Sequence, residues 1–344
     1  MHHPRLEKLG PVIRRAYNLQ TERYFSLDLL RVTAAAQPGT SCSLYLGMGC
    51  VKWTLIFTIV VLPLSAVVVQ WMNYVDIESY YKDKRIILTG ASEGIGKNLA
   101  IRLSQLGATL VIAARTESKL KDTQKLCQKY SQDVFVVRAD VGKEEDNKLL
   151  VSEAVKHLGG IDILILNAGH THVDFFVDTE NPAKLYEEVF RVNVLQGVYL
   201  TQFSLPYLRE SHGTIVAISS IGDTGILTPP SAGSYVTSKH ALKGHFGSLN
   251  MEFEIRKENI SITIMPLGLV YTERVLKMPT VSTESIWGIE PGITPADCAD
   301  RITRGIPLKK LYYFITWDTF IIGHLSSLCP VCFDRIFAKM IFDE

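Results

Sequence analysis

The sequence predicts an α/β fold in which a doubly wound parallel sheet follows a single membrane-spanning helix. Short runs rich in β-branched residues alternate with helical stretches from Lys84 onward, the pattern of repeated βαβ units. A glycine-rich turn directly follows the first of these runs, and a stretch without charged residues, 53–75, precedes them. These three observations predict one large domain, residues 80–300, behind an N-terminal membrane anchor.

The uncharged stretch contains an apolar segment bounded by tryptophans, Trp53 to Trp71, close to the ~20 residues with which a helix crosses a bilayer. A buried core helix would show polar residues at a 3.6 period, and a cleaved signal peptide would be shorter and end in a small-residue cleavage site. We therefore predict a transmembrane anchor at 48–75. Basic residues flank both sides, so charge does not predict its orientation. Residues 1–47 are predicted to be a poorly ordered extension, or an artefact of choosing a start codon upstream of Met48.

Six short runs predict the strands of the sheet, and the intervals are long enough for crossover helices. The predicted strands are 85–88, 109–113, 134–137, 163–166, 214–218 and 261–265, with helices at 96–106 and 147–158 among those between them. Residues 301–344 are aromatic and apolar. This tail is predicted to cap the core, to lie on a membrane surface, or both.

The composition excludes several classes of function. The chain has 344 residues, 47% of them hydrophobic, and a formal net charge of +1, so there is no basic excess for binding nucleic acid. Six scattered cysteines do not predict a disulfide scaffold. Cys329 and Cys332 form a lone CxxC, and His170 and His172 have no further ligand spacing. We therefore predict no metal site, and we expect the two histidines to line a pocket.

The turn from Thr89 to Gly96 runs from a strand into a helix. In this context glycines let backbone N–H groups approach a pyrophosphate, and the helix N-terminus adds partial positive charge. A turn that is glycine-rich by chance is the alternative. The pattern predicts a Rossmann-type dinucleotide site whose first candidate residues are Gly90, Ser92, Glu93, Gly94, Ile95 and Gly96.

The end of the second strand bears on the choice of dinucleotide. An NAD enzyme usually places an acid there for the ribose 2′-hydroxyl, whereas this chain has Ala114 followed by Arg115 and Thr116. Arginine is a partner for a 2′-phosphate. Glu93 points the other way, because many NADP enzymes of this kind have a basic residue at its position. The sequence favours NADP(H) and leaves NAD(H) as the alternative.

Tyr235 and Lys239 predict acid–base chemistry. A spacing of four puts phenol and ammonium on one face of a helix, and a neighbouring cation is expected to lower the pKa of the tyrosine. Hydride transfer to a ketone requires such a proton donor. Ser219 and Ser220 end the preceding strand, where doubly wound folds bind ligands. A turn-capping role for either serine is the alternative.

Taken in order, these motifs resemble the short-chain dehydrogenase/reductase family over roughly residues 84–273. The resemblance makes Tyr235 the general acid/base and Ser220 the group that orients the carbonyl. Lys239 would bind the nicotinamide ribose and lower the pKa of Tyr235, which also borders the cofactor, and Asn193 would hold a water in a proton relay. Further cofactor contacts are expected from Asp140, Val141, Asn167, Ala168, Gly169, Leu267, Gly268 and Thr272.

Four features resemble one branch of this family: the single N-terminal anchor, the runs 163–167 and 267–273, and the aromatic C-terminal tail. By these features the chain is most similar to the branch of 11β-hydroxysteroid dehydrogenase type 1 and its like proteins. That resemblance implies a homodimer anchored in the endoplasmic reticulum membrane, a lumenal catalytic domain, and a steroid or other lipid substrate. Reductases of 3-ketosphinganine type, retinol-type dehydrogenases and a non-catalytic membrane scaffold are the alternatives. The interval from Ser220 to Tyr235 is longer than usual and carries Pro229-Pro230, so the substrate loop is expected to differ.

Overall fold

The computed structural model describes residues 75–172, 175–224, 231–277, 292–317 and 319–321. All of them belong to one compact unit, Asn73–Glu344. The predicted extension at 1–47, the predicted anchor up to residue 74, the Pro229-Pro230 loop and the Cys329/Cys332 pair lie outside the described residues. Within the described ranges, no helix combines the length and the apolar character that crossing a membrane requires.

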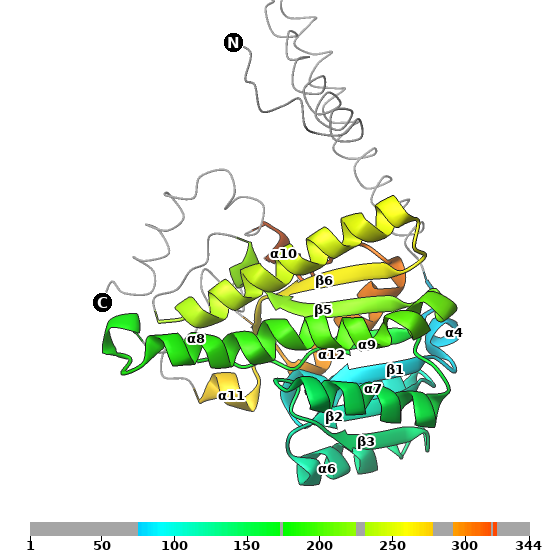
Figure 1. Ribbon diagram of the computed structural model, residues 1–344. Coiled ribbons are helices and arrows are strands. Elements are labelled where there is room, and N and C mark those ends of the chain that lie inside the picture. The colour runs from blue at the N-terminus through cyan, green and yellow to red at the C-terminus, as the bar shows by residue number, and fades with distance from the viewer. Residues whose placement is uncertain (1–74, 173–174, 225–230, 278–291, 318, 322–344) are drawn as a thin grey trace, which may run out of the picture. The chain divides into compact units, whose positions relative to one another are not determined.

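A six-stranded sheet forms the centre of the domain, with strand order β3-β2-β1-β4-β5-β6 and every neighbouring pair parallel (Figure 1). The strands are β1 (Arg85–Thr89), β2 (Thr109–Ala114), β3 (Val134–Arg138), β4 (Ile163–Leu166), β5 (Thr214–Ser220) and β6 (Ser261–Leu267). The predicted doubly wound, Rossmann-type sheet is confirmed. The order reverses between β1 and β4, and such a fold binds ligands outside the carboxyl ends of its strands at that point.

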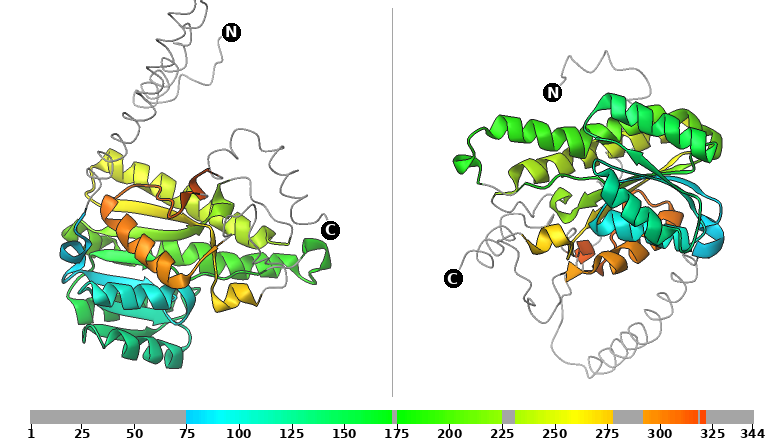
Figure 2. Two further views of the ribbon diagram at one scale, coloured as in Figure 1. Left: turned by 180° about the vertical axis from the view of Figure 1, so that it is seen from behind. Right: turned by 90° about the horizontal axis from the view of Figure 1, so that it is seen from below.

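Helices cover both faces of the sheet, because side chains along each strand alternate between two apolar clusters. Ile86 and Leu88 of β1 pack into one cluster and Ile87 into the other. The first cluster includes residues of α5 (Gly94–Gln105), α6 (Glu117–Cys127) and α12 (Pro295–Gly305). The second includes residues of α7 (Glu144–Leu158), α9 (Gln196–Ser211) and α10 (Gly233–Arg256). The two views of Figure 2 show these layers from behind and from below.

Two helices begin earlier than the sequence predicts. α5 begins at Gly94, where the prediction began at residue 96, because the glycine turn leads straight into the first helical residue. α7 begins at Glu144, three residues before the prediction, with acidic residues throughout its first turn. Those carboxylates suit the positive end of a helix but interrupt the apolar period on which the prediction depended.

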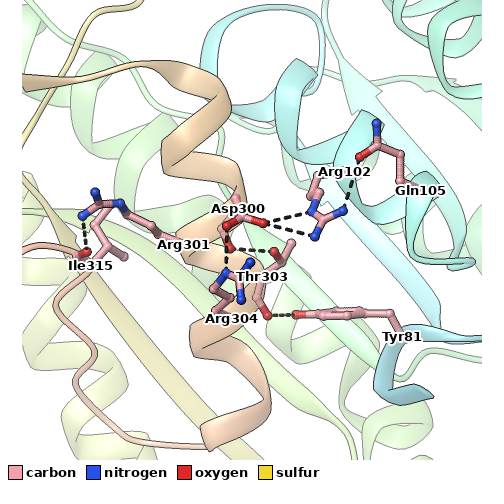
Figure 3. A network of polar contacts seen from close by, with 8 residues as sticks. All are labelled: Tyr81, Arg102, Gln105, Asp300, Arg301, Thr303, Arg304 and Ile315. Carbon is pink, nitrogen blue, oxygen red and sulfur yellow. Dashed lines mark hydrogen bonds and ion pairs between the residues drawn. The ribbon is translucent and has the colours of Figure 1, made fainter. Parts of the chain in front are cut away.

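Polar contacts fasten α12 to α5 and to α4 (Ile77–Tyr81) at the rim of the domain (Figure 3). Asp300 accepts from Arg102 Nε at 3.1 Å and from Arg304 Nε at 2.8 Å. The buried Tyr81 hydroxyl donates to Thr303 O at 2.8 Å. These contacts join three helices, α4 and α5 near the start of the domain and α12 near its end.

The beginning of the C-terminal tail lies along β6. Ile264 N donates to Leu311 O at 2.7 Å, and Tyr313 N donates back to Ile264 O at 3.0 Å. Ile315 is buried in the first apolar cluster, whereas Trp317 is 80% exposed. Residues 311–315 thus pack against the core, and membrane contact by the rest of the tail stays a prediction.

Candidate active site

Glycines shape the turn between β1 and α5 at the reversal point of the sheet. Gly90 and Gly94 have φ angles of +69° and +56°, a region that side-chain-bearing residues rarely enter. A Cβ on Gly90 would come within 2.7 Å of Ala168 Cα, and one on Gly96 would collide with Gly90 O. The backbone therefore forms the close cradle that a pyrophosphate requires.

Hydrogen bonds join the turn after β4 to this glycine turn. Asn167 Nδ2 donates to Thr89 O at 2.9 Å and to Gly90 O at 3.2 Å. Thr89 Oγ1 accepts from the backbone N–H groups of Asn167 and Ala168 at 3.1 Å and 3.0 Å. The predicted segment Asn167 to Gly169 thus borders the glycine turn, as a cofactor cleft requires.

The remaining predicted cofactor residues surround the same edge of the sheet. Arg115 follows β2 and is exposed, while Thr116 is the N-cap of α6. Asp140 follows β3, where its Oδ1 accepts from Gly142 N at 3.1 Å, and the neighbouring Val141 is buried. Ser92 and Ile95 lie within the glycine turn, and Leu267 and Gly268 follow one another at the end of β6.

Thr272 reaches the glycine turn from the segment that follows β6. Its methyl carbon lies 3.1 Å from the position that a Cβ on Gly94 would occupy. Its hydroxyl accepts from Val275 N at 3.3 Å and caps α11 (Glu273–Leu276). This segment therefore closes one side of the cradle.

An ion-pair network that sequence reasoning missed lies at the outer edge of the cradle. Glu93 Oε2 accepts from Lys119 Nζ at 2.8 Å, and Glu93 Oε1 accepts from Arg274 Nη2 at 2.9 Å. Arg274 Nη1 also donates to Gly169 O at 3.1 Å. The hydrogen bond from Lys119, with a further one from Arg274, lowers the pKa of Glu93. No motif marks Lys119 or Arg274, because the fold alone brings them to Glu93.

Tyr235 and Lys239 meet as their spacing predicts. Lys239 Nζ lies 5.6 Å from the centroid of the Tyr235 ring and donates to Ile218 O of β5 at 2.9 Å. Burial lowers the pKa of Lys239 to about 8. Burial also raises the pKa of Tyr235, and the opposing hydrogen bond with Ser220 does not outweigh it. The expected net lowering of the tyrosine pKa is therefore wrong for this structure, because desolvation outweighs the favourable contacts.

The two serines at the end of β5 point to different partners. Ser220 forms a hydrogen bond with the Tyr235 side chain, and its Oγ accepts from Gly222 N at 3.2 Å. Ser219 instead donates to Asp223 Oδ2 at 2.5 Å. Since alternate residues of a strand face opposite sides, only Ser220 stands beside the phenol.

Asn193 ties the cofactor side of the crevice to α10. It lies in a π-helical turn, η4 (Arg191–Leu195), a feature often found at functional sites. Its Oδ1 accepts from His170 N at 2.7 Å, while its Nδ2 donates to His170 O at 2.9 Å and to Ser238 Oγ at 2.8 Å. Ser238 Oγ in turn donates to Tyr235 O at 2.6 Å. Asn193 thus positions both halves of the site, and its part in a proton relay stays a prediction.

The two histidines lie at the mouth of this region. The rings of His170 and His172 stack with centroids 6.4 Å apart. Burial, with the charges of Arg115 and Arg274, lowers the pKa of His170. Within the described ranges no group of three or more metal-ligating side chains is found.

The family model for short chain dehydrogenases matches residues 84–280. Similar proteins include a "Hydroxysteroid 11-beta-dehydrogenase 1-like protein" of Danio rerio, 35% identical over 78% of this chain and 91% of its own. An "11-beta-hydroxysteroid dehydrogenase A" of Sesamum indicum is 37% identical over 55% of this chain and 53% of its own.

Solved structures show the same fold. A short chain dehydrogenase/reductase from Burkholderia phymatum in complex with NAD has a TM-score of 0.63 and 24% identity, covering 72% of this chain and 94% of its own. A short-chain alcohol dehydrogenase structure from Sinorhizobium meliloti has a TM-score of 0.59 and 22% identity, covering 70% of this chain and 97% of its own. At these identities the likeness concerns the fold alone.

Proposed function

Because the chain belongs to the short-chain dehydrogenase family, whose members are NAD(P)-dependent oxidoreductases, we propose that it transfers a hydride between NADP(H) and a lipophilic alcohol or ketone of the hydroxysteroid/ketosteroid kind. The observation that carries this proposal is the meeting of Tyr235, Lys239 and Ser220 at the carboxyl end of β5. This is where a doubly wound fold presents its ligand.

The chain's own residues supply the proton chemistry. The Ser220 hydroxyl holds the substrate oxygen beside Tyr235, and the Tyr235 phenol gives its proton to the oxygen as the carbonyl is reduced. Lys239, fixed by Ile218 O at 2.9 Å, keeps a cation behind the phenol. When bound, the nicotinamide supplies the hydride. The glycine cradle fits such a dinucleotide, because its backbone approaches too closely for side chains at Gly90 and Gly96.

The cations around Glu93 support NADP(H) over NAD(H). Glu93, which would repel a 2′-phosphate, is already neutralised by Lys119 and Arg274. Arg115 stands at the end of β2 and is exposed. Lys119, Arg274 and Arg115 outnumber the carboxylates Glu93 and Glu273, which both act on Lys119. This edge therefore has a net positive charge, which favours the more anionic dinucleotide.

A steroid substrate is supported by the names of the relatives, a "Hydroxysteroid 11-beta-dehydrogenase 1-like protein" at 35% identity among them. Ketosphingoid bases and retinoids are the alternatives, since the described pocket chemistry requires only an apolar carbonyl compound. A non-catalytic scaffold is disfavoured, because Ser220, Tyr235 and Lys239 are all present and in contact.

Anchoring in the endoplasmic reticulum membrane, a lumenal domain and homodimerisation belong to the same proposal. The apolar stretch Trp53 to Trp71 supports the anchor. On α10, Met251 and Ile255 are 64% and 79% exposed and lie one turn apart. They form an apolar face that a second subunit would cover.

The experiment is a screen of the purified full chain in detergent. Steroid ketones, retinal and 3-ketosphinganine are each offered with NADPH and with NADH, and coenzyme oxidation is followed by absorbance. Turnover of a steroid ketone with NADPH is expected. Coenzyme binding without turnover of any carbonyl compound would contradict the enzymatic proposal, and no dinucleotide binding by calorimetry would favour the scaffold.

A further inference from the structure

A buried carboxylate follows Ser220 by three residues. Asp223 is in η5 (Ile221–Asp223), the short helical turn that follows Ser220, and its residue is 1% exposed. Its Oδ2 accepts the 2.5 Å hydrogen bond from Ser219 Oγ. Among the described residues, its Oδ1 has no hydrogen-bond partner. Burying a carboxylate of which one oxygen accepts no hydrogen bond costs stability, so we expect Asp223 to have a functional role.

Lys243 of α10 only partly compensates this acid. Its Nζ donates to Asp223 O at 3.0 Å but remains 3.8 Å from Asp223 Oδ1. The lysine also lies over the Tyr312 ring, 5.5 Å from its centroid, and its side chain is 35% exposed while that of Asp223 is fully buried. The two side chains are therefore unequally buried. A neutral residue in place of Asp223 would fill the same space without the penalty of burying a charge.

The charged and titratable groups that face Asp223 come from three elements. β5 contributes Ser219, α10 contributes Tyr235, Lys239, His240 and Lys243, and the segment beside β6 contributes Tyr312.

The electrostatic influence between Asp223 and these groups runs both ways. Burial raises the pKa of Asp223, while the hydrogen bond from Ser219 and the charges of the three basic side chains of α10 lower it. The carboxylate in turn acts to raise the pKa values of Tyr235 and Lys239. Asp223 is thus the one anion acting on both members of the pair among the described residues.

We propose that Asp223 is a positioning residue of this site, which holds the turn after Ser220 in place through Ser219 and Lys243 and puts a buried negative charge behind Tyr235 and Lys239. For the phenol, the charge adds to burial in retaining the proton. For the ammonium, it opposes burial, which favours loss of the proton. The arrangement therefore favours the reduction of a carbonyl, in which the phenol is the donor. This inference rests on the proposed function, which it deepens by giving the site a preferred direction.

The first test is the pH profile of Asp223→Asn. The amide keeps an acceptor for Ser219 but removes the charge. For alcohol oxidation with NADP⁺, the acidic limb of kcat/KM in Asp223→Asn is expected to move to lower pH by about 0.5 to 1 unit, the ordinary spread that surroundings cause in folded proteins. Asp122→Asn, which removes a 70% exposed carboxylate on α6, is the matched control and should leave the limb in place. An unmoved limb in an active, folded Asp223→Asn would overturn the proposal, because a purely structural role lowers kcat without shifting the profile.

The second test does not depend on activity. A buried acid with a raised pKa holds its proton more tightly in the folded state, so the stability of the wild type should fall as pH rises from the ordinary aspartate value of 3.8 through the raised value. Asp223→Asn, or Asp223→Ser if the amide variant does not fold, should lack this part of the pH dependence of thermal unfolding. Identical curves would show that Asp223 carries no buried charge and would end the inference. A wild type that turns over no substrate but shows the difference would end only the proposed function.

Discussion

Two polar clusters of this domain handle charge in opposite ways. At the rim, Asp300 pairs with Arg102 at 3.1 Å and with Arg304 at 2.8 Å, and the three side chains are 28% to 58% exposed. In the site, Lys239 is 5% exposed and Asp223 is 1% exposed. Among the described residues, Asp223 Oδ1 accepts no hydrogen bond, and Lys243 Nζ lies 3.8 Å from it. The rim carboxylate is thus closely paired and partly exposed, whereas the carboxylate of the site is loosely paired and buried.

We infer from this difference that the rim charges matter little for activity, whereas the buried charges of the site are needed for the reaction. Exposed ion pairs contribute little to stability, with a median of about 0 to 1 kcal/mol. Buried ionisable groups lower stability, and proteins retain them where function requires a perturbed group. Substituting Lys239 in the site should therefore lower activity and raise stability, whereas substituting Asp300 at the rim should leave activity unchanged and lower stability slightly.

Lys239→Met should show the largest contrast. The pKa of Lys239, about 8 in the fold, lies below the ordinary value of 10.5. Burying its charge therefore costs stability below pH 8, and this penalty disappears as pH rises from about 8 towards 10.5. Lys239→Met should unfold at a higher temperature than the wild type at pH 7 and should lose most turnover.

The stability gained by Lys239→Met at pH 7 has an upper limit. At 1.36 kcal/mol per unit the penalty is at most about 3 kcal/mol, reduced by about 1 kcal/mol for the lost hydrogen bond to Ile218 O. Thermal unfolding at pH 7 and pH 10 measures it. A variant less stable than the wild type at pH 7 would contradict the contrast between buried and exposed charges.

Gly96→Ala tests whether the cradle is as close as its geometry indicates. The added methyl group would collide with Gly90 O, a backbone atom that cannot move aside. Coenzyme affinity should fall by at least about tenfold, equivalent to 1.4 kcal/mol, as measured by calorimetry. Gly244→Ala, where the added Cβ meets nothing within 4 Å, is the matched control. Equal affinity in both variants would show that the pyrophosphate does not enter this turn.

The Glu93 network is about as exposed as the rim, with side chains 40% to 56% exposed, but it borders the glycine turn, so its substitutions should change coenzyme binding. Arg115→Ala should weaken NADPH binding more than NADH binding, because only NADPH carries a 2′-phosphate, by about 1.5 to 3 kcal/mol for a charged hydrogen bond. Glu93→Gln should strengthen NADPH binding, since it removes a charge that repels the 2′-phosphate. Equal losses for both coenzymes in Arg115→Ala would refute the phosphate contact.

Asp300→Asn at the rim should have the smallest effect. Its ion pairs with Arg102 and Arg304 are partly exposed, so the free energy of unfolding should fall by about 1 kcal/mol or less. Activity should not change, and raising the salt concentration should shrink the difference further. A loss of turnover in this variant, measured beside a denaturant unfolding curve, would show that the rim communicates with the site.

The parts of the molecule that sequence predicts are those with a local or periodic signal. All six strands of the main sheet were predictable from β-branched runs: β4 has the predicted bounds, and the other five extend one or two residues further than predicted. The glycine turn and the Tyr235/Lys239 pair were found because their spacing along the chain is fixed by a turn or a helix. Ser220 was distinguished from Ser219 by family resemblance, and its bond with Tyr235 agrees with that choice.

What sequence did not predict depends on distant segments meeting. Glu93 lies 26 residues from Lys119 and 181 from Arg274, so no local pattern joins them. In the sequence Asp223 resembles an ordinary turn residue, and only in the fold do β5 and α10 enclose it. The direction of the Tyr235 pKa was wrong for the same reason, since the spacing reveals the neighbouring cation but not the depth of burial.

In the proposed reaction, the Tyr235 phenol transfers the proton that accompanies hydride transfer. The direct measurement is single-turnover reduction of the best ketone from the screen by NADPH, in the wild type and in Tyr235→Phe, with coenzyme affinity determined in parallel. The phenylalanine variant should bind NADPH normally and lose roughly 10²- to 10⁴-fold in rate. Reduction at the wild-type rate by Tyr235→Phe would contradict the account.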